Sequence, residues 1–144
     1  EKDFAFFHPG GALGRRLLLS VGDIMRSGPA NPIVKEEEKV SRVLLKITQA
    51  RAGSATVVDK KGKLTGIFTD GDLRRHVEID RDLALRRIKE VMTRNPTVVY
   101  RDMLALEALR ILREKRIDEL PVVDKNRRPV GLLDVQDLLK AGLI

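Results

Sequence analysis

Hydrophobic and polar positions along the chain follow a pattern that occurs twice. After a short apolar stretch at Ile33-Val34, apolar residues stand at positions 40, 43, 44 and 47, the i, i+3, i+4, i+7 spacing of a half-buried helix. The apolar runs SATVV and LTGIF then flank the turn DKKGK and predict a pair of strands. A last helix is expected after Thr69. The pattern predicts a β-α-β-β-α unit, preceded by a short helix that ends in Ile24-Met25.

The same unit returns 65 residues later, where VVDKNRRPVGLLDVQDL (122–138) matches VVDKKGKLTGIFTDGDL (57–73) without a gap. Upstream, VGDIM (21–25) corresponds to IKEVM (88–92). A unit of about 60 residues buries only a small core, so two such units are expected to pack together. The expected fold class is α/β (α+β), with two tandem β-α-β-β-α repeats packed as a pseudo-twofold pair. The expected boundaries are residues 1–20 for a leading segment, 21–79 for the first repeat and 80–144 for the second.

Composition and charge limit the classes of binding partner that the chain is expected to have. The formal net charge is +7, which suits nucleic acid, an anionic membrane, an anionic small ligand or simply a solvated surface. Nucleic-acid binding is disfavoured because aromatic residues make up 3% of the chain and the basic residues alternate with acids. No apolar run is long enough to span a bilayer, so no membrane partner is expected. The chain has no cysteine, so no disulfide is expected, which fits a reducing cytoplasm. Its two histidines are far apart in the sequence, so no metal site is expected either.

The stretch Thr69-Asp70-Gly71-Asp72 has two interpretations. It matches a capping box, in which Thr69 is the N-cap and Asp72 bonds back to its N–H group. The same geometry suits a nucleotide: the hydroxyl can donate to a phosphate, and the carboxylate can accept from ribose hydroxyls. Gly71, a further candidate of this site, would let another backbone segment approach closely. Arg74 and Arg75 add charge for a phosphate or carboxylate, although a solvated first helical turn explains them as well.

The second copy departs from this pattern. Asp134 replaces the threonine and Gln136 replaces the glycine, whereas Asp137 is retained. An aspartate is a good N-cap, but its charge repels a phosphate. We therefore expect the second copy to be mainly structural, with only a ribose contact left for Asp137.

The doubled Gly-apolar-x-Thr-x-x-Asp-apolar pattern, Gly66–Leu73 in the first copy, resembles the tandem cystathionine-beta-synthase (CBS) domains of Bateman modules. The resemblance implies a ligand cleft between the repeats, in which Thr69 and Asp72 contact phosphate and ribose. Backbone groups of Ile33, Ala55 and Thr56 would contact the base. It also implies that two CBS pairs associate face to face as a homodimer.

The segment HPGGALGRRLLLSVGDIM (8–25), together with GIFTDGDLRR, resembles the sugar isomerase (SIS) enzymes that convert D-ribulose 5-phosphate to D-arabinose 5-phosphate. In that family an SIS domain precedes the CBS pair and the full-length protein is a tetramer. Residues 1–20 would then be the tail of the SIS domain and a linker, and this chain the C-terminal regulatory part.

His8 is a candidate acid or base only together with that SIS domain, so we expect no catalytic residue and no isomerisation in this chain alone. Because the pathway leads to Kdo, CMP-Kdo and lipopolysaccharide, CMP-Kdo is favoured over AMP or ATP as the effector. No cofactor is expected. The alternative is a ligand-free structural module that stabilises the isomerase oligomer.

Overall fold

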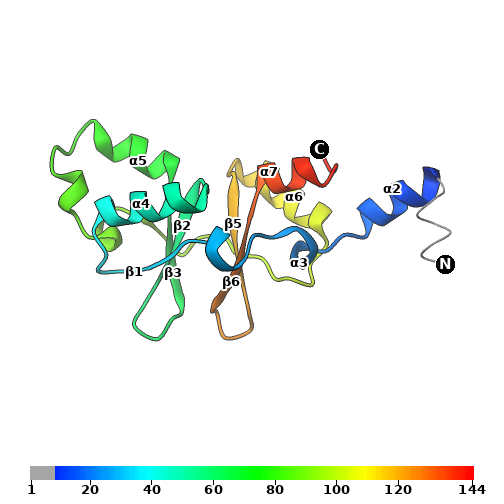
Figure 1. Cartoon of the computed structure of the whole chain (residues 1–144), viewed down its shortest axis with the longest axis horizontal. Helices are drawn as coiled ribbons and strands as arrows, with labels where there is room; N and C mark the ends of the chain where they lie inside the picture. Colours follow the sequence, from blue (N-terminus) through cyan, green and yellow to red (C-terminus); the bar gives the residue numbers. More distant parts are fainter. Residues whose placement is uncertain (1–8) are drawn as a thin grey trace.

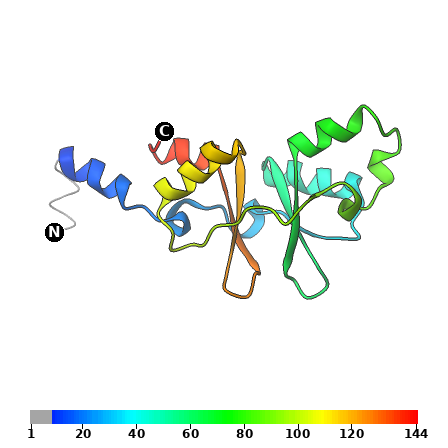
Figure 2. The same cartoon turned by 180° about the vertical axis from the view of Figure 1, so that it is seen from behind.

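The computed structural model describes residues 9–144, in which two similar α/β bodies lie side by side (Figure 1). The elements are α2 Pro9–Leu17, α3 Val21–Ile24, η1 Gly28–Ala30, β1 Ile33–Lys35, α4 Val40–Ala50, β2 Ser54–Val58, β3 Leu64–Thr69, α5 Asp70–Val77, η2 Leu83–Leu85, η3 Ile88–Glu90, β4 Thr93–Arg94, α6 Ala105–Lys115, β5 Glu119–Val123, β6 Pro129–Asp134 and α7 Val135–Lys140. Helix α2 extends away from both bodies, and the hairpins β2–β3 and β5–β6 are neighbours in both views (Figures 1 and 2).

The expected β-α-β-β-α order is confirmed in the first repeat. Strand β1 pairs in parallel with β2, and β2 pairs antiparallel with β3. Helix α4 buries the predicted stripe, with Val40, Val43 and Ile47 turned inward. These side chains share one core with Val57 and Phe68 from the sheet. The apolar periodicity therefore places α4 on the sheet face that holds this core.

The first strand of the second repeat is shortened to a single parallel bridge between Val99 and Val122. In the first repeat, the N–H of Thr56 donates to the carbonyl of Pro32 at 3.0 Å. The equivalent of Thr56 is Pro121, which has no N–H group to donate. Loss of this ladder bond explains why the pairing in the second repeat is shorter.

The short lead-in segment at the start of each repeat packs against the other repeat. Val21 and Met25, in the lead-in segment of the first repeat, pack in the core of the second. Ile88 and Met92, in the lead-in segment of the second repeat, belong to the core of the first. In addition, β4 pairs with β3, and Arg26 forms the equivalent bridge with β6. The lead-in segments are thus exchanged between the repeats, which the sequence pattern does not predict.

A further buried layer joins the two bodies. Val58, Ile67 and Leu132 are buried but belong to neither core cluster. Their neighbours along the strands face the cores, so alternation turns them toward the other body. At the hairpin turns, the N–H of Leu64 donates to the carbonyl of Arg127 at 2.9 Å. The predicted packing of the repeats as a pseudo-twofold pair is confirmed.

Candidate functional site

A cleft of about 500 Å³ lies where the two repeats meet beside the start of α5. One wall comes from the first repeat, at the end of β3 and the first turns of α5. The other wall comes from residues 93–97 and 115–119, which lead into the second repeat and into β5. Its volume lies within the range of roughly 300–1,000 Å³ that is typical of small-molecule sites. The lining residues are Ile67, Thr69, Asp70, Gly71, Arg74, Arg75, Thr93, Asn95, Pro96, Thr97, Lys115, Arg116, Ile117, Asp118 and Glu119.

The predicted capping box is present at the start of α5. The backbone N–H of Asp72 donates to Oγ1 of Thr69 at 3.2 Å, and the N–H of Thr69 donates to Oδ2 of Asp72 at 2.9 Å. Thr69 has extended backbone angles, as an N-cap requires. The capping interpretation of this stretch is therefore correct as far as local structure is concerned, and it leaves the ligand interpretation open.

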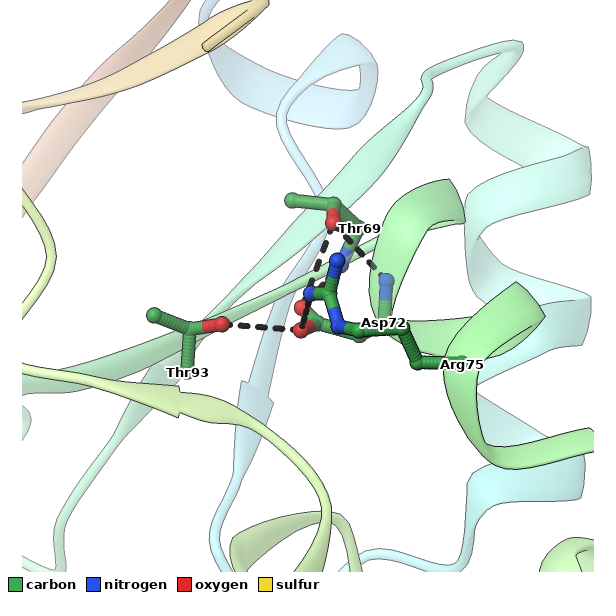
Figure 3. A network of polar contacts seen from close by, with 4 residues as sticks. All are labelled: Thr69, Asp72, Arg75 and Thr93. Atoms are coloured by element: carbon green, nitrogen blue, oxygen red, sulfur yellow. Dashed lines mark hydrogen bonds and ion pairs between the residues drawn. The ribbon is translucent and has the colours of Figure 1, made fainter. Parts of the chain in front are cut away.

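The carboxylate of Asp72 is the centre of a polar network (Figure 3). The residue is only 3% exposed. Besides the N–H of Thr69, its oxygens accept hydrogen bonds from Oγ1 of Thr69 at 3.2 Å, from Oγ1 of Thr93 at 2.8 Å and from the guanidinium of Arg75. Because Thr93 belongs to the exchanged lead-in segment, this network connects α5 to the opposite wall of the cleft.

The cleft carries both signs of charge. Four cationic side chains, those of Arg74, Arg75, Lys115 and Arg116, line it together with three carboxyl groups, those of Asp70, Asp118 and Glu119. Arg75 is paired with Asp72, but its side chain remains 66% exposed. The arginines on α5 and at the end of α6 therefore flank the opening from both sides, where they suit an anionic group.

The structure brings together only part of the predicted site. Thr69, Gly71, Arg74 and Arg75 line one cleft, and Asp72 lies directly behind them. Other predicted residues lie apart from it: Ala55 and Thr56 are fully buried in β2, Ile33 is exposed on β1, and Asp137 lies in the second repeat.

The reason for this difference is that the cleft is built across the repeats. Position 98 is equivalent to Ile33, and Leu120 and Pro121 are equivalent to Ala55 and Thr56. Residues of the cleft lie next to these equivalents, at Thr97 and Glu119. The prediction assigned base contacts to the repeat that holds Thr69, whereas the wall of the cleft opposite Thr69 comes from the other repeat.

A second cleft of about 410 Å³ occupies the pseudo-symmetric position beside α7. Asp134 caps α7 and forms a capping box with Asp137, as predicted. The guanidinium of Arg26 lies 3.4 Å from an oxygen of each carboxylate and also donates to the carbonyl of Arg51 at 2.9 Å. Burial raises the pKa of Asp137 above its ordinary value, and Arg26 opposes that rise. An internal cation thus stands at the position equivalent to Thr93 in the first cleft.

Sequence reasoning missed several residues of the site, namely Thr93, Arg116, Glu119 and Arg26. Thr93 and Arg26 occupy equivalent positions, each directly after a lead-in methionine. The repeat register could have identified this pair, but not the repeat that each one contacts. Within residues 9–144, no three histidine, cysteine, aspartate or glutamate residues gather as metal ligands. His8 lies outside the described residues.

Comparison with known protein families gives a match to the CBS domain over residues 21–79 and again over residues 88–144. Arabinose 5-phosphate isomerase KdsD of Pseudomonas aeruginosa is 47% identical over 143 residues, which are 99% of this chain and 44% of that protein. KdsD of Francisella tularensis is 43% identical, over 99% of this chain and 43% of its own length. The chain therefore spans less than half the length of these relatives.

Solved structures are similar over most of the chain. CBSX2 in complex with AMP shares 26% identity and a TM-score of 0.73, covering 87% of this chain and 96% of that one. The CBS domain pair of MJ0100, in complex with 5′-methylthioadenosine and S-adenosyl-L-methionine, has a TM-score of 0.77 at 24% identity, covering 85% of this chain and 94% of that one. In the part of the chain that the structure describes, no helix is both long and apolar enough to cross a membrane.

Proposed function

The chain belongs to the CBS domain family, and from this premise we propose that it is the nucleotide-sensing regulatory module of an arabinose 5-phosphate isomerase. The observation that carries the proposal is the convergence of Thr69, Gly71, Arg74 and Arg75 on one cleft between the repeats. The identity to the KdsD enzymes supports the link to the isomerase. Isomerisation itself, and any role of His8 in it, would then reside in the region of those relatives that this chain does not cover.

The proposed ligand places its phosphate at the start of α5. The backbone N–H groups of the first turn and the arginines beside them favour an anion there. A ribose hydroxyl would take the place of Thr93 or Arg75 as a donor to Asp72, since the carboxylate already accepts four hydrogen bonds. The complex of CBSX2 with AMP supports a nucleotide as the ligand class.

Within that class we favour CMP-Kdo over AMP or ATP. The pathway of the resembled isomerases leads to CMP-Kdo, a later product that is a sensible feedback signal. Its cytidine monophosphate half suits Thr69 and Asp72, and its sugar carboxylate suits an arginine such as Arg116 across the cleft. The same proposal places the protein in the cytoplasm, which its lack of cysteine permits.

Replacing Thr69 by alanine is expected to raise the dissociation constant for CMP-Kdo or AMP roughly tenfold, because a hydrogen bond to a charged phosphate is lost. The matched control is Asp134→Ala, which removes the N-cap at the equivalent position of the second repeat. Each variant loses a cap that contributes about 0.5–2 kcal/mol of stability, and Asp134→Ala also loses its ion pair with Arg26. Titration calorimetry on folded protein separates the two effects, because only the ligand site changes affinity.

Equal affinity of wild type and Thr69→Ala for every nucleotide tested would reduce this stretch to a capping box. The alternative, a structural module without a ligand, would then be preferred. Thermal-shift measurements with a series of nucleotides would first distinguish a nucleotide sensor from a ligand-free structural module. A ligand that binds the folded state raises the melting temperature.

We further propose that two chains associate face to face, within a tetramer of the full-length protein. Leu138 does not contribute to such a surface, because it is fully buried against the second core. Leu45, Val77 and Leu139, on α4, α5 and α7, are each half exposed and supply apolar area instead. Light scattering at high protein concentration should give the mass of a dimer, and a strictly monomeric mass would contradict this assignment.

A further inference from the structure

The turns of the two hairpins form a basic surface away from the clefts. Residues 59–63 and 124–128 contain six cationic side chains and two carboxylates, so they supply four of the seven net positive charges of the chain. The turns precede β3 and β6, whereas the clefts lie where these strands end. Both views show the turns as neighbours on the side away from the helices (Figures 1 and 2). We call them the hairpin surface, and its cations are Lys60, Lys61, Lys63, Lys125, Arg127 and Arg128.

The carboxylates of the two turns are used by the backbone. Oδ1 of Asp59 accepts hydrogen bonds from two N–H groups of its own turn at 2.8 and 3.0 Å, and Oδ1 of Asp124 does the same in the second turn. The guanidinium of Arg128 joins the turns by donating to the carbonyl of Lys61 at 2.9 Å. None of the six cations forms an ion pair with a carboxylate of residues 9–144. The hairpin surface is therefore a fixed arrangement of cations without counter-charges, which is prepared to bind an anionic partner.

An apolar hollow of about 700 Å³ adjoins the second turn. Tyr100, Met103 and Val123 supply its apolar surface, and Tyr100 is 46% exposed. Arg101 and Lys125 also line the hollow, so it continues into the hairpin surface through Lys125. The other lining residues are Asp102, Asp124 and Asn126.

The apolar lining of this hollow is not required by the fold. In the first repeat, the positions equivalent to Tyr100 and Met103 are occupied by Lys35 and Glu38. Tyr100 belongs to neither core cluster, although both repeats have similar cores. An exposed aromatic residue at this place therefore suits a contact with a partner better than it suits the packing of the repeat.

We propose that the hairpin surface and the hollow together bind an acidic polypeptide segment of a partner protein, one that carries a bulky apolar side chain. The cations attract and orient the acidic residues, and the hollow takes the apolar side chain as an anchor. A flat lipid surface does not enter a hollow. A single-stranded nucleic acid would need aromatic residues between the cations, and the two turns contain none. The combination of cations and an apolar hollow therefore favours a polypeptide.

Two synthetic peptides test the proposal on the full chain. One is a short run of glutamates, and the other carries the same charge and one central phenylalanine. Fluorescence polarisation should show that the phenylalanine peptide binds roughly tenfold more tightly, because it buries an aromatic side chain in the hollow. The affinity for both peptides should fall as the salt concentration rises, because exposed charges are screened.

Three variants assign the binding to this surface. Tyr100→Ala should lower the affinity for the phenylalanine peptide to near that for the glutamate peptide. Lys125→Glu should weaken the binding of both peptides roughly three- to tenfold, because it replaces an attraction between exposed charges by a repulsion. The matched control is Arg81→Glu, which makes the same change of charge at an exposed position beyond α5 and should bind as wild type does. Circular dichroism checks that each variant is folded.

Equal affinity of wild type for the two peptides, or equal losses in Lys125→Glu and Arg81→Glu, would overturn the proposal, and so would the absence of binding by both peptides. Vesicles of phosphatidylcholine and phosphatidylglycerol in equal parts, and a single-stranded oligonucleotide, are measured at the same salt concentration. Tighter binding of either one than of the phenylalanine peptide would assign the surface to a membrane or to nucleic acid instead. Each of these outcomes leaves the proposed nucleotide cleft unaffected.

Discussion

Replacing Arg26 by methionine should lower the free energy of unfolding by about 2–4 kcal/mol at pH 7, because it leaves two poorly exposed carboxylates without their cation. The side chains of Arg26, Asp134 and Asp137 are 17%, 8% and 10% exposed, so solvent compensates little. The hydrogen bond from Arg26 to the carbonyl of Arg51 is lost as well. Methionine retains most of the apolar stem, so the loss reports on the charge rather than on packing.

The deficit of this variant should grow with pH. Burial already raises the pKa of Asp137, and removal of Arg26 takes away a charge that lowers it. When the folded pKa of a carboxyl group lies above the unfolded one, the folded state binds more protons between the two values, so stability falls as the pH rises through that window. The variant should therefore be closest to wild type at or below the unfolded pKa of about 4, and its deficit should be complete once the pH exceeds the raised folded pKa of Asp137.

Urea unfolding of wild type and Arg26→Met at pH 5 and pH 8 measures the loss of stability and its increase with pH. The control is Arg42→Met, which removes a cation whose side chain is 66% exposed and 3.7 Å from Glu38. Such a surface pair contributes at most about 1 kcal/mol. An Arg26→Met deficit no larger than that of Arg42→Met would show that the second cleft does not depend on its internal cation.

Gly131→Ala should be nearly as damaging, with a loss of about 2–3 kcal/mol and a melting temperature lower by roughly 5–10 °C. A β-carbon on Gly131 would overlap the sulfur of Met25 and lie 2.9 Å from the carbonyl oxygen of Arg26. The methionine could adjust, but the backbone carbonyl is fixed because Arg26 bridges β6 in both directions, with hydrogen bonds to Leu132 of 2.7 and 2.9 Å. The added methyl group must therefore separate the lead-in segment from the second body.

Gly66→Ala tests the same contact in the other half, where Met92 and the carbonyl of Thr93 take the corresponding places. Gly14→Ala is the control, since nothing lies within 4 Å of its β-carbon position and α2 gains a better helix former. Thermal unfolding that is unchanged in Gly131→Ala and Gly66→Ala would contradict the close approach of both lead-in segments.

The internal repeat made much of the fold predictable from sequence. The apolar stripe of α4, the strand pair around DKKGK and both capping boxes depend on local spacing, and the structure confirms them. The exchange of the lead-in segments is not local. Met25 and Met92 are equivalent residues, and their burial is the same whichever repeat they contact. The apolar periodicity predicts that a residue is buried, but it does not indicate which of the two repeats the residue packs against.

The candidate site shows the same limit. Thr69 and Asp72 were identified because a motif lies within one continuous stretch. The opposite wall, with Thr93 and Glu119, belongs to the other repeat and carries no motif of its own. Glu119 is equivalent to Ser54, a residue whose hydroxyl is fully buried, so the repeat register alone does not suggest an ionisable group in a cleft.

The exchange of lead-in segments also makes the two bodies unequal in the order in which they can fold. The first core runs without interruption from Val34 to Met92, so it can close as soon as the ribosome has released that stretch. The second core needs Val21 together with residues between Val99 and Leu138, and the whole first body lies between them. Closing so long a loop costs more entropy and slows folding. In effect the first body is an insertion in the second, and Val21 has no complete core to pack into until the chain has been made as far as Leu138.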